Sequence, residues 1–119
     1  MAETKTYTGG CHCGEVRFEV TADLSNVVAC NCSICQKRGA LWTFVSAESF
    51  ALRAGTDDLK DYQFAKKVIH HLFCQQCGVG SYSRGKGPGG EEMIAVNVRC
   101  LDGVEVESLK PKAIDGKSL

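Results

Sequence analysis

Alternation of hydrophobic and polar residues is clearest in the N-terminal part of the chain. Across residues 15–20, Val16, Phe18 and Val20 share one face and charged residues occupy the other. A period of two is the pattern of a β-strand that is buried on one side only. The sequence therefore predicts a strand here, with its apolar face packed into a core.

Short runs of the same kind recur along the chain, most of them separated by turn-forming residues. They predict further strands at residues 42–46, 50–53, 60–64, 68–73, 80–84 and 93–99. A single short helix is predicted over residues 33–38, with Ser33 as its cap. Residues 85–90, GKGPGG, predict an exposed loop, interpreted as a hairpin connection in preference to a ligand-binding lid. Together these elements indicate a mainly β architecture.

Length and charge then narrow the classes of protein to consider. The chain has 119 residues, which favours one domain over residues 1–119, and its 14 Lys and Arg balance 14 Asp and Glu. Without surplus positive charge, nucleic-acid binding is disfavoured. Apolar runs fall short of the roughly 20 residues of a membrane span, and MAETKTYTGG lacks the apolar stretch of a secretory signal. We expect a cytoplasmic protein that binds neither nucleic acid nor membrane.

Cysteine is the unusual component of the composition, since the chain has 8 and seven of them fall in tight clusters. The clusters are a C-x-C, a C-x-C-x-x-C and a C-x-x-C, formed by Cys11 and Cys13, by Cys30, Cys32 and Cys35, and by Cys74 and Cys77. Adjacent cysteines suit one tetrahedral ion, and cytosolic thiols stay reduced. We therefore expect zinc in preference to disulfides, a redox pair or an iron–sulfur cluster, whose characteristic spacings are absent.

The number of thiolates that the clusters supply distinguishes two kinds of zinc site. The first and third clusters together supply four ligands, which would close a structural site on Cys11, Cys13, Cys74 and Cys77. The middle cluster supplies three and leaves a position open to water or substrate, as catalytic sites do. Spacing alone leaves open two alternatives. Cys100, a histidine or a carboxylate could close the second site, or the middle cluster could share an ion with Cys74 or Cys77.

The remaining residues with possible chemistry have simpler interpretations. His12 lies between two presumed ligands in extended chain, so its side chain points away from theirs. His70 and His71 are consecutive in a predicted strand, so one should face inward and the other solvent, and packing or surface roles are favoured over catalysis. Cys100 and Trp42 are expected in the core.

Three motifs in order, followed by N-V-R-C-L-D-G at residues 97–103, resemble those of the glutathione-dependent formaldehyde-activating family. They are G-G-C-H-C-G at 9–14, C-N-C-S-I-C-Q-K-R-G at 30–39 and F-C-Q-Q-C-G at 73–78. The resemblance runs from Tyr7 to about Gly103. It implies a zinc-stabilised β-tent fold of short antiparallel strands. It also implies a structural zinc on the first and third clusters and a catalytic zinc on the middle one.

The resemblance further implies a reaction. Formaldehyde and the thiol of glutathione combine reversibly to S-(hydroxymethyl)glutathione, which is a carbon–sulfur lyase reaction run backwards. A zinc ion with an open position suits this chemistry, because it lowers the pKa of a bound thiol and presents it as a thiolate. Charge and proximity alone suggest that Lys37 and Arg38 contact glutathione carboxylates, the alternative being a solvated surface pair.

Two features broaden this interpretation. The chain is near the minimal domain of the family, so another thiol or another aldehyde would fit the same residues. Three ligands also hold an ion less firmly than four, so the second zinc is expected to be the more labile of the two. The alternative function is a non-catalytic binding module stabilised by two closed zinc sites.

Overall fold

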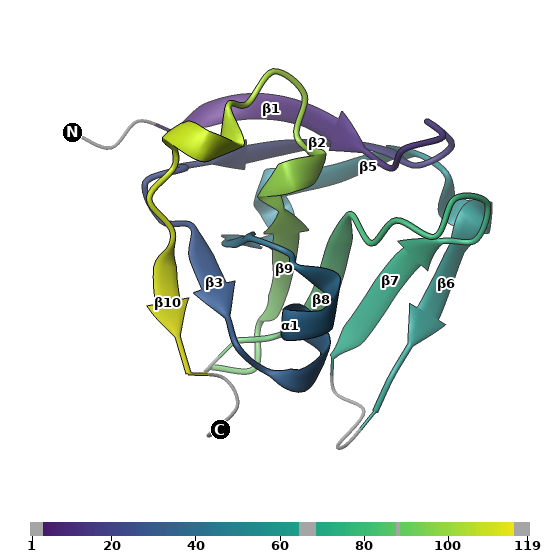
Figure 1. The fold of residues 1–119 in the computed structure, drawn as a ribbon. Helices are drawn as coiled ribbons and strands as arrows, with labels where there is room; N and C mark the ends of the chain where they lie inside the picture. The colour runs from purple at the N-terminus through teal and green to yellow at the C-terminus, as the bar shows by residue number, and fades with distance from the viewer. Residues whose placement is uncertain (1–3, 65–68, 88, 116–119) are drawn as a thin grey trace.

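The computed structural model describes residues 4–64, 69–87 and 89–115, and within them ten strands form two sheets (Figure 1). The smaller sheet has the order β1-β2-β5, with bounds β1 Lys5–Gly10, β2 Arg17–Ala22 and β5 Phe50–Ala54. The larger has the order β10-β3-β4-β9-β8-β7-β6, with bounds β10 Lys112–Ile114, β3 Val28–Cys30, β4 Trp42–Ser46, β9 Glu92–Asn97, β8 Tyr82–Lys86, β7 His70–Cys74 and β6 Leu59–Tyr62. The predicted mainly β fold is confirmed.

Helical structure in the described residues is limited to short segments. The α-helix α1 spans Ser33–Arg38, as predicted. Its N-cap is Cys32 rather than the predicted Ser33, and Cys32 makes no capping hydrogen bond with its side chain. The 3-10 helices are η1 Ala47–Ser49, η2 Thr56–Asp58, η3 Val98–Cys100 and η4 Val106–Ser108. No helix in these residues is long and apolar enough to cross a membrane.

Strand boundaries follow the predictions unevenly. Strand β4 has the predicted bounds, whereas β5 to β9 differ from theirs by one to a few residues, and residue 68 of the predicted 68–73 strand lies outside the described residues. Strand β2 begins at Arg17 instead of residue 15, because the Cys11 N–H donates to the Val16 carbonyl (3.1 Å) and turns the chain there. Strands β1, β3 and β10 were not predicted from the sequence. Among the described strands, the β3 and β10 pair is also the exception to antiparallel pairing.

The core lies between the two sheets, and Figure 1 shows the smaller sheet across the top of the view with the larger one below it. Val16, Phe18 and Val20, the predicted apolar face, are 0–1% exposed. Phe50 joins them from β5, with its ring 5.1 Å from Phe18 and 4.6 Å from Tyr82 of β8. One face of the larger sheet is thus covered by the smaller sheet, and aromatic packing holds the two together.

The other face of the larger sheet carries a different row of side chains. Strand register places Phe44 opposite Ala95, Ala95 opposite Ser83, and Ser83 opposite His71. Because directly paired residues point to the same side of a sheet, these four residues form one row across β4, β9, β8 and β7. Neighbouring positions of the same strands, such as Val45, Ile94 and Tyr82, belong to the core. The row therefore faces away from the core.

The predicted loop at residues 85–90 connects β8 to β9. Lys86 pairs with Glu92, and the Gly87 N–H donates to the Glu91 carbonyl (2.8 Å), so the interpretation as a hairpin connection is confirmed. Gly85 and Lys86 belong to β8 rather than to the loop. Residue 88 lies outside the described residues.

Candidate functional site

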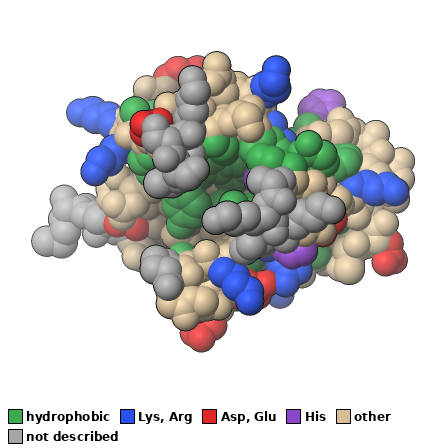
Figure 2. All heavy atoms as spheres, turned by 90° about the horizontal axis from the view of Figure 1, so that it is seen from below, with side chains coloured by type: hydrophobic (Ala, Val, Ile, Leu, Met, Phe, Trp, Pro, Cys, Tyr) green, Lys and Arg blue, Asp and Glu red, His purple; other side chains and the backbone are tan. Residues whose placement is uncertain are grey.

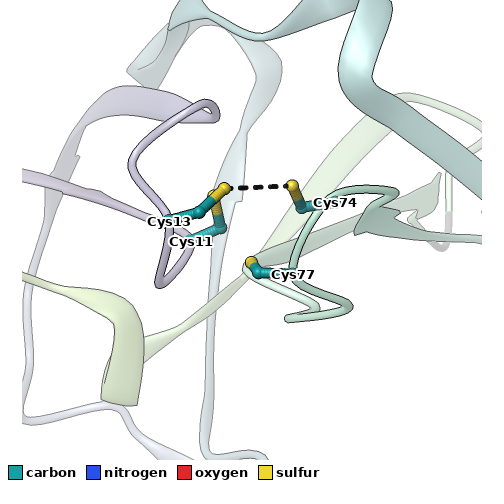
Figure 3. Close-up of side chains that lie close together, drawn as sticks. All are labelled: Cys11, Cys13, Cys74 and Cys77. Carbon is teal, nitrogen blue, oxygen red and sulfur yellow. Dashed lines mark hydrogen bonds between the residues drawn. The ribbon is translucent and has the colours of Figure 1, made fainter.

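The first and third cysteine clusters meet in space. Cys11 and Cys13 follow β1, Cys74 ends β7 and Cys77 lies in the turn after it, and Figure 3 shows the two pairs facing each other. All four Sγ atoms lie within 4.8 Å of one another, with 3.6 Å from Cys11 to Cys13 and 3.7 Å from Cys13 to Cys74. Sulfur atoms at about 2.3 Å from a tetrahedral zinc are separated by about 3.8 Å. We call this group the four-cysteine cluster.

Backbone N–H groups donate to sulfur atoms of this cluster. The Gln76 N–H donates to Cys74 Sγ (3.4 Å) and the Val16 N–H to Cys11 Sγ (3.3 Å). The C-x-x-C turn closes when the Gly78 N–H reaches the Cys74 carbonyl (2.8 Å), and Gly78 has φ +81°, a conformation that favours glycine. Backbone N–H groups of Cys13 and Val79 hold the pKa of the Cys77 thiol at about 6. The donor set therefore fits a metal that binds sulfur.

The four-cysteine cluster also connects the two sheets. One pair of cysteines follows β1 of the smaller sheet, and the other lies at the end of β7 of the larger sheet and in the turn after it. Cys74 is 0% exposed and belongs to the core. An ion held by all four thiolates would therefore fix one sheet against the other.

The middle cluster forms a separate group of three, the three-cysteine cluster. Cys30 ends β3, Cys32 is the N-cap of α1 and Cys35 lies within α1, and their Sγ atoms lie within 4.8 Å of one another. Among the described residues, no fourth His, Cys, Asp or Glu side chain joins them. Cys74 and Cys77 belong instead to the four-cysteine cluster.

Cys100, which spacing left open as a fourth ligand, lies elsewhere. The prediction that it lies in the core is wrong, because Cys100 is half-buried in η3, at the edge of the packed region. It is also outside both groups of candidate ligands. Burial raises the pKa of its thiol to about 11, and the charges that act on it come from Cys11 and Cys77. Cys100 is therefore a protonated and partly apolar thiol whose pKa responds to two members of the four-cysteine cluster.

Hydrogen-bond donors also surround the three-cysteine cluster. The Trp42 Nε1–H donates to Cys35 Sγ (3.2 Å), and the Cys32 N–H donates to Cys30 Sγ (3.4 Å). Burial acts to raise the pKa of the Cys32 thiol, but the backbone N–H groups of Cys35 and Ile34 and the two neighbouring thiols outweigh it and lower that pKa. For Cys35, burial dominates and raises the pKa of its thiol to about 12. The N–H donors that point at Cys30 and Cys35 are arranged as they are around metal-bound sulfur.

A cavity of about 490 Å³ adjoins the three-cysteine cluster. Figure 2 shows hydrophobic side chains gathered in a hollow on this side of the molecule. Besides the three cysteines, the described lining residues are Trp42, Phe44, Ile69, His71, Ser83, Gly85, Lys86, Gly87, Met93, Ala95 and Ile114. This volume lies within the range of about 300–1,000 Å³ usual for small-molecule sites. The row of residues on the free face of the larger sheet is therefore one wall of the cavity.

His71 and Trp42 contribute more than the packing that the sequence indicated. His71 is 8% exposed and lines the cavity, whereas His70 faces outward and its Nδ1 lies 2.7 Å from Asp61 Oδ2, so the predicted division of the pair is confirmed. Burial lowers the pKa of His71, and the positive charge of Arg38 lowers it further. Trp42 is 4% exposed, as expected of a core residue, and its ring also lines the cavity.

Three other candidates lie outside the cavity wall. His12 is exposed and is not among the side chains grouped in the four-cysteine cluster. Lys37 is exposed on α1. Arg38 is half-buried against Gly80, where a Cβ would lie 2.8 Å from Arg38 Nη1, so glycine provides the space for the guanidinium. The charge of Arg38 acts on Cys35 and His71.

Comparison with known proteins agrees with this geometry. A family model described as glutathione-dependent formaldehyde-activating enzyme matches residues 6–115. The fold is similar to the crystal structure of a Rhodobacter sphaeroides protein studied as a structural genomics target. The two superpose with a TM-score of 0.79 at 29% sequence identity, over 90% of this chain and 99% of that one. Because the family model covers nearly all of the described residues, the chain belongs to the glutathione-dependent formaldehyde-activating enzyme family.

Proposed function

We propose that the protein is a carbon–sulfur lyase-type enzyme that forms and cleaves adducts between a thiol, such as glutathione, and an aldehyde. The observation that carries this proposal is a cluster of three cysteines that adjoins a cavity of ligand size, with no fourth ligand among the described residues. In this proposal Cys30, Cys32 and Cys35 hold a catalytic zinc. The four-cysteine cluster holds a structural zinc.

The residues present fit such ions. Sulfur separations near those of a tetrahedral zinc site and N–H donors aimed at sulfur are both found in the four-cysteine cluster. When bound at the three-cysteine cluster, zinc would lower the pKa of a substrate thiol and hold it as a thiolate. From the sequence we expect a cytoplasmic protein. In that reducing compartment cysteines remain thiols and can bind metal.

Residues of the cavity would then bind the aldehyde and transfer the proton that the thiol releases. A carbon–sulfur bond forms, the carbonyl π bond breaks, and the proton of the thiol ends on the new hydroxyl oxygen. His71 lines the cavity and is kept in its neutral form by burial and by Arg38, so its ring can accept a proton and return it. The apolar wall limits competing water, which hydrates aldehydes.

Arg38 supplies positive charge behind the three-cysteine cluster. Three thiolates outweigh the charge of one divalent ion, and a substrate thiolate adds to the excess, so a buried cation near Cys35 stabilises the assembly. We therefore propose a charge-balancing role for Arg38 in place of carboxylate binding. Neither Arg38 nor Lys37 is among the described residues that line the cavity.

Arg38→Gln should lower zinc affinity at the three-cysteine cluster by roughly 10- to 100-fold, the range seen when outer-shell partners of a metal are removed. Lys37→Gln is the matched control, because it removes the neighbouring positive charge from an exposed position of the same helix. Competition with a chromogenic chelator measures the affinity. Equal zinc affinity in Arg38→Gln and Lys37→Gln would contradict the role proposed for Arg38.

The function itself is tested by zinc content and by exchange. Freshly purified, reduced protein should contain two zinc ions per chain, of which one is lost on mild chelation and retained when glutathione is added first. Exchange spectroscopy with carbon-13 formaldehyde and glutathione should show faster interconversion with the protein than in buffer alone. Two firmly held ions indifferent to glutathione, with no acceleration of exchange, would support the binding module instead.

A further inference from the structure

We propose that the cavity beside the three-cysteine cluster takes an adduct whose aldehyde-derived carbon carries an apolar substituent about the size of an aromatic ring. The adduct's hydroxyl is bound by Ser83. The proposal rests on the proposed function and names the substrate class for the same site. It is carried by the chemistry of the cavity wall and by one buried hydroxyl.

The cavity wall is far more apolar than glutathione and formaldehyde alone require. Phe44, Ala95 and Met93 lie on adjacent strands β4 and β9, and Ile69 and Ile114 extend the apolar lining. Phe44 is 51% exposed and Ile69 is 49% exposed, although both are large hydrophobic residues. Burial of such side chains against an apolar ligand removes their surface from water and favours binding.

Charge along the wall indicates how the adduct is oriented. Among the described lining residues, Lys86 carries the one formal charge outside the cysteines, and it lies at the end of β8. Glutathione has two carboxylates and an ammonium group, which are costly to bury against apolar side chains. Its charged ends therefore remain at the rim or outside. The apolar wall is left to the other half of the adduct.

Ser83 is a second and independent indication of a ligand. Its side chain is buried, with 4% of the residue exposed, and its Oγ has no hydrogen-bond partner among the residues that the structure describes. Ser83 lies between His71 and Ala95 in the row across the sheet, and all three line the cavity. A buried hydroxyl without a partner is unfavourable, so it is suited to a ligand that brings a hydroxyl of its own. The adduct R–S–CH(OH)–R′ has that hydroxyl next to its apolar substituent.

Trp42 provides a direct readout, because it is the single tryptophan of the chain and lines the cavity. With zinc-loaded full-length protein, benzyl alcohol should change Trp42 fluorescence saturably, whereas glycerol should not. Phe44→Ser should weaken benzyl alcohol binding about tenfold. Tyr62→Ser should weaken it far less. Tyr62 is an equally exposed aromatic residue, at 50%, that is not among the lining residues, although its ring lies 6.4 Å from that of His71.

The role of Ser83 is tested by comparing two probes that differ by one hydroxyl group. Ser83→Ala should weaken binding of benzyl alcohol several-fold and leave binding of toluene unchanged. The conservative Ser83→Thr variant keeps a hydroxyl and should retain part of the difference. Equal effects of Ser83→Ala on both probes would overturn the assignment of Ser83.

Turnover separates this proposal from the proposed function. With glutathione as the thiol, kcat/KM for phenylacetaldehyde should exceed that for formaldehyde by about tenfold or more, and Phe44→Ser should reduce the ratio. Turnover of formaldehyde without benzyl alcohol binding would overturn the substrate class and leave the proposed function standing. Saturable binding that Phe44→Ser weakens, without turnover of either aldehyde, would support the ligand class and contradict the function.

A dimer that Phe44→Ser dissociates, with no binding of benzyl alcohol, would show that a second copy covers the wall and would also overturn the proposal.

Discussion

Cys74→Ser should unfold the protein. An ion held by four thiolates contributes about 10–16 kcal/mol of binding free energy to folding, and a whole domain is stable by only about 5–15 kcal/mol. Cys74 is 0% exposed, receives the Gln76 N–H and joins segments from both sheets. Thermal denaturation followed by circular dichroism, with zinc measured per chain, should show loss of the cooperative transition and of the firmly held ion.

Cys100→Ser is the matched control for this experiment. Cys100 is a half-buried cysteine that joins neither group of candidate ligands. Its replacement should lower the melting temperature by a few degrees at most and leave the zinc content unchanged. If Cys74→Ser melted like Cys100→Ser and retained the same zinc, the four-cysteine cluster would not be a structural metal site.

Cys32→Ser should instead abolish activity in a protein that remains folded. Cys32 is a half-buried N-cap residue that makes no capping hydrogen bond with its side chain, so the helix loses no cap when it is replaced. Two ligands hold zinc much less firmly than three. We expect loss of the labile ion and a fall in kcat/KM beyond the roughly 10- to 100-fold that outer-shell changes cause. The melting temperature should change far less than in Cys74→Ser.

The pattern across the two cysteine variants discriminates between the two functions. An enzyme with one structural and one catalytic ion predicts unfolding in Cys74→Ser and an inactive, folded protein in Cys32→Ser. A binding module with two closed sites predicts a large loss of stability in both. Denaturant midpoints for Cys32→Ser, measured beside Lys37→Gln as a surface control on the same helix, decide the point.

Local features of the fold could be predicted because they depend on neighbouring residues. The alternation of Val16, Phe18 and Val20 predicts a buried face, and all three are fully buried. The predicted bounds of β4 and α1 agree with the structure. Strands β3 and β10 were not predicted because each has three residues, too few for alternation to show. They are defined by pairing with strands distant in the sequence.

For the candidate site, too, local features could be predicted from the sequence and long-range contacts could not. Each cysteine cluster could be recognised from the sequence, because its members are separated by only one or two residues. Ligands so near to one another in the chain can bind the same ion. Spacing left open which clusters meet, and the family resemblance implied the grouping that the structure displays. Cys13 and Cys74 are separated by 61 positions in the chain, and packing of the two sheets brings their sulfur atoms to 3.7 Å.

The sequence by itself thus determined the mainly β class, the two kinds of cysteine cluster and the expectation of zinc. Tertiary structure alone decided that His71 and Ser83 share one wall with Phe44 and that this wall adjoins the three-cysteine cluster. It also decided that Arg38 lies against Gly80. The physical reason is the range of the interactions. Alternation and ligand spacing act within a few residues, whereas strand register and the burial of a cavity wall depend on packing between segments far apart in the chain.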